Sequence, residues 1–308
     1  MSRASEATAS DREAFRTCRN VCRRRGGDFY LATFFLPRPK RDAVHALFAF
    51  CCLIADAVQA DDGEPSASPT PTTVGAACCS TNSFDQRVGL LRQRVVDIFT
   101  SPAAVPYADD RDADQAAVYA FAQTLRRHPM PQEYFTDLIE GARLEATVPR
   151  FATWKSLDRC LALRWGSIAL AVAAILGLTN TGARDRVIDL GKAIGLIKIL
   201  RRLPEDAAAG KVRVPLEDLA RSGYGERDLL AQTMNDRRSD FLKLEIERAR
   251  RLFNSAREAI PSLAGDGSRL AVATVITLYD RSLDRLNGSL STWQRVRLLP
   301  RIWAAARA

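Results

Sequence analysis

Carboxylates, histidines and cysteines are the side chains through which this sequence could carry out acid–base, nucleophilic or metal chemistry. His45 and His128 are the only histidines, and the seven cysteines include no Cys-x-x-Cys pair. The ligand spacing of a structural zinc site is therefore missing from the sequence. The cysteine number is odd and two pairs are sequence neighbours, which predicts free thiols in a reduced, cytoplasmic protein.

Few carboxylates have a spacing that suggests a role. Arg202 and Asp206 lie four residues apart, a spacing at which two side chains can pair on one helix face, and a carboxylate neutralised by arginine is a poor magnesium ligand. Glu140 and Glu145 are five residues apart, so only one of them should face a given side of their helix. Asp56 lies near a predicted helix end, where it could be a metal ligand, a general base or an exposed acid.

One histidine and one pair of cysteines lie on the same predicted helix as Asp56. His45 is beside the apolar stripe of that helix, where a hydrogen-bonded structural histidine and a proton-transferring group are both open. Cys51 and Cys52 are interpreted as buried thiols, because the sequence gives no sign of a neighbouring base that would make them nucleophiles.

The elements that must position these side chains are helices. Apolar residues recur at spacings of three and four, whereas alternating strand patterns joined by hairpin turns are absent. The pattern predicts helices over residues 39–59, 85–99, 113–127, 132–147, 156–178, 183–202, 226–255, 267–287 and 289–306. The predicted fold class is therefore all-α, a single helical bundle with more than four helices.

Composition limits the classes of function. Of the 308 residues, 47% are apolar and 26% are charged, which is enough to bury a large core and excludes wholesale disorder. The net charge of +9 attracts anions, but no zinc-finger or RNA-binding motif accompanies it, so no nucleic-acid partner is expected. The apolar run over residues 166–178 is shorter than the ~20 residues that span a membrane, and predicts a buried core helix.

Three parts of the chain are expected to differ in how ordered they are. Residues 1–14 are expected to be loose, residues 15–308 to form one helical domain, and residues 60–83, rich in Ser, Thr, Pro, Gly and Ala, to form a mobile insert within it. The tail over residues 295–308 carries arginines and Trp303, and could pack on the bundle or make peripheral contact with a membrane.

An ordered set of short motifs runs through most of the chain. These motifs are FYLA at 29–32, FLP at 35–37, ALFAFC at 46–51, LIEG at 138–141, ILR at 199–201 and VPLEDL at 214–219. In this order and spacing the chain resembles the squalene/phytoene synthase family from about Phe15 to Ala308.

The resemblance implies a single all-helical domain around a deep central cavity. It also implies two aspartate-rich helices that face each other across the cavity mouth and hold Mg²⁺ against the diphosphate of a prenyl substrate. Carboxylates four residues apart share one helix face, which suits such a cluster. Loss of the diphosphate leaves an allylic carbocation, which apolar and aromatic walls would guide.

The sequence departs from the family pattern at both aspartate-rich motifs. In the first motif, Ala55 and Gln59 stand where the family has its outer aspartates, and only Asp56 is kept. Cys52 stands where the family has an arginine before the motif. In the second, Arg202 stands in place of the first aspartate and only Asp206 is kept. Gly195 and Lys198 stand where the family has Gln and Asn, and Glu145 stands where it has an aspartate. Cys160 and Arg213 stand where the family has tyrosines. Asp61 and Asp62, in the insert, could replace some of the missing carboxylates.

The site residues follow from the resemblance. Asp56, Glu145, Asp206 and His45 are the candidate catalytic residues, and no metal ligand is assigned. The candidate substrate-binding residues, some of which could equally be core, are Phe29, Tyr30, Phe48, Cys52, Trp165, Arg201 and Arg202.

Three functions remain open at this point. We favour a diverged enzyme that cyclises or couples a polyene or isoprenoid-like hydrophobic small molecule by acid–base steps, without metal-driven diphosphate ionisation and without a cofactor. The second is a head-to-head prenyl-diphosphate synthase with a reduced Mg²⁺ site. The third is a non-catalytic family member that binds a lipid or a protein. The sequence does not indicate an oligomeric state.

Overall fold

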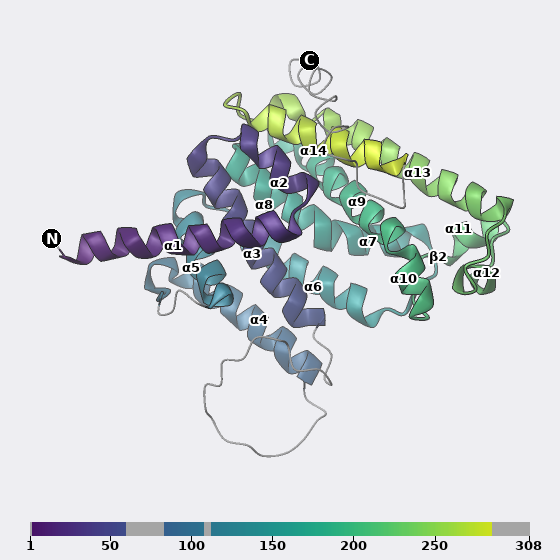
Figure 1. Ribbon diagram of the computed structural model, residues 1–308, viewed down its shortest axis with the longest axis horizontal. Coiled ribbons are helices and arrows are strands. Elements are labelled where there is room, and N and C mark those ends of the chain that lie inside the picture. The colour runs from purple at the N-terminus through teal and green to yellow at the C-terminus, as the bar shows by residue number, and fades with distance from the viewer. Residues whose placement is uncertain (1, 60–82, 108–111, 285–308) are drawn as a thin grey trace.

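The described residues of the computed structural model, 2–59, 83–107 and 112–284, form an all-α bundle (Figure 1). The long helices are α1 (Ser2–Arg25), α3 (Arg38–Gln59), α4 (Ser83–Thr100), α5 (Ala113–Arg127), α6 (Glu133–Thr147), α8 (Ser167–Leu176), α9 (Arg184–Arg201), α13 (Asp236–Arg257) and α14 (Ser268–Leu283). The short helices are α2 (Asp28–Ala32), α7 (Trp154–Leu161), α10 (Leu203–Ala208), α11 (Leu216–Arg221) and α12 (Glu226–Leu230). The remaining helical segments are η1 (Thr33–Phe35), η2 (Pro102–Ala104), η3 (Ala162–Gly166), η4 (Thr181–Ala183) and η5 (Ile260–Ser262).

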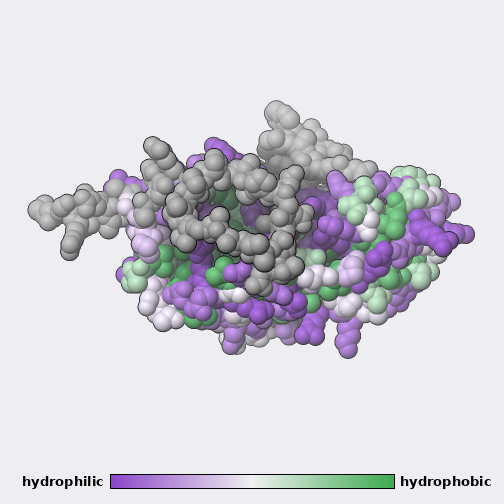
Figure 2. Space-filling view, turned by 90° about the horizontal axis from the view of Figure 1, so that it is seen from below, coloured by the Kyte–Doolittle hydropathy of each residue, from purple (hydrophilic) through white to green (hydrophobic). Residues whose placement is uncertain are grey.

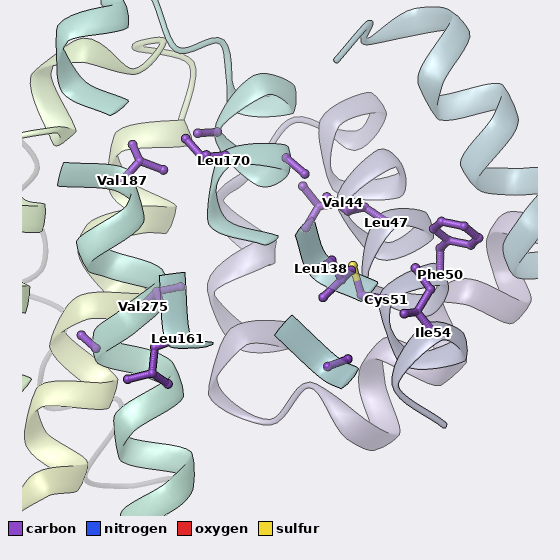
Figure 3. Packing of buried hydrophobic residues seen from close by; sticks show 14 of the residues in the cluster. Val44, Leu47, Phe50, Cys51, Ile54, Leu138, Leu161, Leu170, Val187 and Val275 are labelled. Atoms are coloured by element: carbon purple, nitrogen blue, oxygen red, sulfur yellow. The ribbon is translucent and has the colours of Figure 1, made fainter. Parts of the chain in front are cut away.

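Helix α3 is central to one half of the bundle. It packs against α1, α5, α6 and α8, and its residues Val44, Leu47, Cys51 and Ile54, spaced by three or four, are all buried. Figure 3 shows these side chains on one side of α3, directed into the core. The apolar stripe read from the sequence is therefore the buried face of this helix, as expected.

An aromatic cluster fixes α3 against α5 and α6. The rings of Phe50 and Phe121 stack with centroids 4.3 Å apart, and Phe135 lies 4.7 Å from Phe121. All three side chains are fully buried, so they contribute both area and specific ring geometry to this half of the core.

Helix α9 organises the other half of the bundle. It packs against α13, α8 and the π-helical segment η3. A Cβ built on Gly191 would lie 2.2 Å from the carbonyl oxygen of Trp165, and one on Gly195 would lie 2.3 Å from the Trp165 ring. Two glycines therefore let α9 approach η3 more closely than any larger residue would allow.

Two short strands join distant parts of the chain. Residues Arg150–Phe151 (β1) pair in parallel with Val212–Pro215 (β2), with an irregularity in register between Arg150 and Phe151. The alternation is too short to be recognised in the sequence. Its effect is to hold the end of α6 beside the segment that follows α10.

The structure differs from the predicted elements at several places. Helix α1 already begins at Ser2, where a loose segment was expected, because alanines at 4, 7, 9 and 14 favour helix and Ala14, Phe15 and Cys18 bury its later turns. The predicted helix 226–255 is divided between α12 and α13 by a turn in which Gln232 has φ 52°. Most of the predicted insert 60–83 and the helix 289–306 lie outside the described residues.

Two stretches are long and apolar enough to cross a membrane, Arg38–Gln59 and Trp154–Leu176. The second is longer than the apolar run read from the sequence, because α7, η3 and α8 are continuous. However, 61% and 56% of their most apolar windows are buried within the bundle, which is the expected arrangement of core helices.

A buried ion cluster supports the outer end of the bundle between α11 and α13. Arg248 Nη1 donates to Asp218 Oδ2 at 2.7 Å and to Glu245 Oε1 at 2.6 Å, and the guanidinium stacks over Trp154 at 4.2 Å. One guanidinium thus serves two buried carboxylates. Burial raises the pKa of Glu245 to about 7, and Asp218 adds to this increase, although Arg248 opposes it.

This cluster predicts a pH dependence of stability. The folded protein binds a proton on Glu245 that the unfolded chain releases near pH 4.5, so the free energy of unfolding should fall between pH 4.5 and about 7. We expect Glu245→Gln to remove this fall, which is on the order of 1–3 kcal/mol. Denaturant unfolding across this range measures it, with Glu247→Gln on the exposed face of α13 as control. Parallel pH curves for wild type and Glu245→Gln would contradict the assignment.

The close approach of α9 to η3 predicts opposite effects for two glycine substitutions. Gly195→Ala should lower the free energy of unfolding by about 1–3 kcal/mol, because its Cβ overlaps the Trp165 ring. Gly89→Ala, in α4, meets no atom within 4 Å and should raise it by ~0.5–1 kcal/mol. Thermal and denaturant melts test both. Equal effects would show that the contact with Trp165 is unimportant.

Candidate functional site

A cavity of about 720 Å³ lies between the two halves of the bundle. Its walls come from α3, α6, η3, α8, α9 and α14, with contributions from the starts of α2 and α4 and from α10 and β2. Figure 2, seen from below, shows a hollow in which hydrophobic residues are visible, with hydrophilic residues around it. The volume is in the range of cavities that bind small molecules.

One end of the cavity is apolar and partly aromatic. Phe29 and Phe48 line it as a stacked pair with ring centroids 5.4 Å apart. The aliphatic lining comes mainly from α8, α9 and α14, and includes Ile168, Val172, Leu176, Ile194, Val272 and Val275. Such a wall suits a hydrocarbon chain and excludes water.

The lining changes along α9 from aliphatic at Val187, Leu190 and Ile194 to cationic at Lys198, Arg201 and Arg202, so positive charge dominates the end of the cavity beside the last turns of α9. Eight of the described lining residues are cationic, namely Arg25, Arg87, Arg164, Lys198, Arg201, Arg202, Lys211 and Arg213. Only Asp56, Glu145 and Asp206 are acidic among the described lining residues. The local excess of positive charge therefore exceeds what the three carboxylates can neutralise.

Glu145 is bound by two arginines from different elements. Arg164, on η3, donates to Oε2, and Arg213 Nη1, on β2, donates to Oε1 at 3.1 Å and to the Glu145 carbonyl at 3.1 Å. Arg213 also reaches Asp206, with Nε 3.5 Å from Oδ1. Burial raises the pKa of Asp206, while Arg213, Arg202 and Lys211 oppose that increase.

The sequence predicts an ion pair between Arg202 and Asp206, and this prediction is wrong, because the pair does not form in the described structure. Helix α9 ends at Arg201, and the Pro204-containing α10 begins at Leu203, so Arg202 occupies a helix boundary. No ion pair within 4.0 Å joins Arg202 to Asp206 among the described residues, and Arg213 is the partner instead. Sequence spacing could not reveal a partner supplied by β2.

Asp56 lines the cavity at its exposed edge. Its side chain is 57% exposed, and Arg25 donates to both carboxylate oxygens, with Nη2 to Oδ1 at 2.7 Å. The pair raises the pKa of Arg25, chiefly through this hydrogen bond. Asp56 is therefore a paired acid at the rim, and not a free base inside the cavity.

Trp165 lies between two cations of the cavity wall. Lys198 Nζ is 4.9 Å from the ring centroid and the Arg164 guanidinium carbon is 5.4 Å from it. Burial lowers the pKa of Lys198, and the nearby Arg164 and Arg201 lower it further, with Cys52 opposing them. The indole thus provides part of the stabilisation that an anionic partner would otherwise give.

Two predicted residues lie away from the cavity. His45 is buried, shares a hydrogen bond of 2.9 Å with Thr33 Oγ1 and stacks on Tyr30 at 5.4 Å. Burial lowers the pKa of His45 to about 4, with Arg19 and Arg41 adding to the decrease. Neither His45 nor Tyr30 is among the cavity-lining residues, so the structure gives them a packing role.

The other predicted residues do meet at the cavity. Asp56, Glu145, Asp206, Phe29, Phe48, Cys52, Trp165, Arg201 and Arg202 all line it. Burial raises the pKa of Cys52 and of Cys51, which keeps both as thiols rather than nucleophilic thiolates. The five cysteines of the described chain are free.

Several lining cations were not predicted from the sequence. Arg25 is one of three consecutive arginines, and Lys211 follows a Gly turn, so neither stands out. Arg164 could have been found, because it is a lone charge within an apolar helix, and such a charge needs a buried partner.

The carboxylates present do not fit a magnesium cluster. Mg²⁺ requires several oxygen ligands, yet all three lining carboxylates accept from or face arginines, and Lys198 and Arg202 add positive charge nearby. No group of three or more His, Cys, Asp or Glu side chains in the described part of the chain could hold a metal ion. Asp61 and Asp62 lie outside the described residues.

Comparison with known proteins gives a consistent picture. The sequence profile of squalene/phytoene synthase matches residues 22–303. The 15-cis-phytoene synthase of Synechocystis sp. is 32% identical over 289 residues, which cover 90% of this chain and 77% of that protein. The 15-cis-phytoene synthase of Synechococcus elongatus is 28% identical over 320 residues, covering 97% of this chain and 95% of that one.

Solved structures share the fold. A dehydrosqualene synthase in complex with a ligand superposes with a TM-score of 0.80 at 21% identity, covering 96% of this chain and 98% of that chain. A squalene synthase from Alicyclobacillus acidocaldarius superposes with a TM-score of 0.69 at 20% identity, covering 96% of both chains.

The double arginine contact predicts a stability cost for removing the Glu145 charge. In Glu145→Gln, Arg164 and Arg213 would lose their shared counter-charge, and the free energy of unfolding should fall by about 1–3 kcal/mol. Glu258→Gln breaks an exposed pair with Arg186 and should cost less than about 1 kcal/mol. Denaturant melts compare the two, and an equal cost would contradict the assigned role of Glu145.

Proposed function

Because the chain belongs to the squalene/phytoene synthase family, we propose that it is a prenyltransferase that couples two prenyl diphosphates head to head. This was the second of the functions left open by the sequence. Two similar proteins, from Synechocystis sp. and Synechococcus elongatus, are 15-cis-phytoene synthases, which supports the proposal. The substrate is then an amphiphile with an isoprenoid chain and a diphosphate head.

The observation that carries the proposal is the division of the cavity into two ends. An apolar wall with the stacked rings of Phe29 and Phe48 suits the hydrocarbon chains. Eight cationic side chains at the other end suit the diphosphates. A substrate with one hydrophobic part and one multiply charged part matches both ends at once.

The coupling can be written with complete balance. The C–O bond of one substrate breaks, and its electron pair leaves with the diphosphate, giving an allylic carbocation. The double bond of the second substrate attacks this cation, so that a C–C bond forms. Loss of the second diphosphate and of two protons then gives a hydrocarbon, and no reductant is consumed. The released diphosphates accept the protons, since the three lining carboxylates are engaged by arginines.

The residues of this chain would stabilise the charges that develop during the reaction and keep water away from the carbocation. Cationic side chains at the head-group end stabilise the leaving diphosphate as its charge develops. The faces of Phe29, Phe48 and Trp165 are aromatic surfaces that stabilise a carbocation, and the aliphatic wall keeps water from it.

Cyclisation by proton donation, the function favoured at the sequence level, has no support from the comparisons, which point to transferases. The geometry also opposes it. Glu145 accepts hydrogen bonds from two guanidiniums and Asp56 accepts two from Arg25, so both carboxylates already have charged partners within the protein.

Incubation with farnesyl or geranylgeranyl diphosphate tests the proposed function, with extraction and mass spectrometry of the hydrocarbon products. We expect a head-to-head product of dehydrosqualene or phytoene type, released with diphosphate. Lys198→Met should reduce the rate by about tenfold or more, because it removes a charge at the head-group end. Lys243→Met should retain the wild-type rate, because it removes only an exposed ion pair with Asp240 on α13.

Reactions are run both with excess magnesium chloride and with EDTA, so that a metal requirement does not conceal activity. Absence of coupled product under both conditions, from protein with a wild-type melting curve, would overturn the proposal. Release of diphosphate without C–C bond formation would also count against it, because the chain would then be a hydrolase.

A further inference from the structure

Only some of the cationic side chains in the cavity form ion pairs with carboxylates in the described part of the chain. Arg25 pairs with Asp56, Arg164 pairs with Glu145, and Arg213 pairs with both Glu145 and Asp206. In the described part of the chain, no ion pair within 4.0 Å involves Lys198, Arg202 or Lys211. The three lining acids are therefore already matched, and these cations are in excess.

Burial makes this excess costly at one position in particular. Lys198 is partly buried beneath Trp165, with Nζ 4.9 Å from the ring centroid. Burial lowers the pKa of Lys198, and Arg164 and Arg201 are close enough to lower it further, whereas Cys52 and Glu145 oppose the decrease. An ammonium group held among other cations is stabilised most simply by an anion from outside the chain.

Arg201 gives an independent sign of an unfilled polar site. It lines the cavity on the α9 side, stacks over Tyr279 at 5.7 Å and lies 4.0 Å from Asp28 Oδ2. Its Nε and Nη2 atoms are buried, and no described residue forms a hydrogen bond with either of them. Buried donors of this kind are nearly always satisfied in folded proteins, so an acceptor supplied by a ligand would complete the site.

Together with Arg201, the three excess cations extend from the interior to the rim. Lys198 and Arg201 are partly buried on α9, whereas Arg202 and Lys211 are exposed at its end and beyond α10. Lys198, Arg202 and Lys211, which have no ion-pair partner within 4.0 Å in the described part of the chain, add positive charge to the lining, and this charge repels a divalent cation and attracts a phosphate anion.

We propose that Lys198, Arg201, Arg202 and Lys211 bind the substrate's diphosphate directly, so that protein cations take the place that divalent metal ions would otherwise have at this end of the cavity. The inference rests on the proposed function for the identity of the ligand. It goes beyond that function in assigning the head-group site to these four residues and in making diphosphate binding independent of magnesium.

Isothermal titration of the full chain with inorganic pyrophosphate tests the site. We expect binding in EDTA, and excess magnesium chloride should not tighten it. Lys198→Met and Arg202→Gln should each weaken binding by about tenfold or more, as expected for loss of a charge-assisted contact with the anion. Lys243→Met and Arg251→Gln, at exposed positions of α13, should leave it unchanged.

A charge-reversal variant provides a stricter test of the site. Arg202→Asp would place a carboxylate four residues before Asp206, and should abolish binding in EDTA while leaving the melting curve cooperative. Binding that requires magnesium in the wild type, or that is insensitive to both Lys198→Met and Arg202→Gln, would overturn the inference. Magnesium-dependent binding that is lost in Asp61→Asn or Asp62→Asn would do so as well.

The outcomes separate this inference from the proposed function. Coupling of prenyl diphosphates that occurs only with magnesium would leave the function standing and reject the metal-independent site. Conversely, pyrophosphate binding in EDTA by a chain that forms no coupled product would support the site and reject the function. An unreactive prenyl thiolodiphosphate that binds no tighter than pyrophosphate would show that the apolar end does not hold the chain.

Discussion

The shared contact of Glu145 with Arg164 and Arg213 is the interaction on which the rest of the site depends. It connects α6, η3 and β2, three elements that are far apart in sequence, at the charged end of one cavity. Asp206 is the second partner of Arg213, so the two carboxylates balance the two guanidiniums and hold them in place. The positive charge that remains at this end of the cavity comes from the neighbouring Lys198, Arg202 and Lys211.

Close packing supplies the second constraint. Gly191 and Gly195 allow α9 to lie against the π-helical segment η3, which carries both Arg164 and Trp165. π-Helical segments occur often at functional sites because they redirect side chains from a regular helix. Here the arrangement places the indole against Lys198, so the packing of the bundle and the charge of its cavity cannot change independently.

The distribution of polarity unites the fold with the proposed chemistry. Membership of the squalene/phytoene synthase family underlies the proposal of prenyl diphosphates as substrates, and the cavity offers a hydrocarbon end and an anion end. Its carboxylates differ from those of a magnesium cluster, because each one faces arginine. An enzyme arranged in this way would use fixed protein charges where a bound metal would otherwise act, and these need no reorganisation when the leaving group departs.

The sequence by itself determined the all-α class and the buried stripe of α3, and nine of its eleven candidate site residues line the cavity, since helical periodicity and ordered motifs are local properties of the chain. Only the tertiary structure decided the partners. Asp206 meets Arg213 across β2, Asp56 meets Arg25 from α1, and His45 is directed into the core next to Thr33. Such pairings depend on which helix ends are brought together, and spacing along one helix carries no information about a partner contributed by another element.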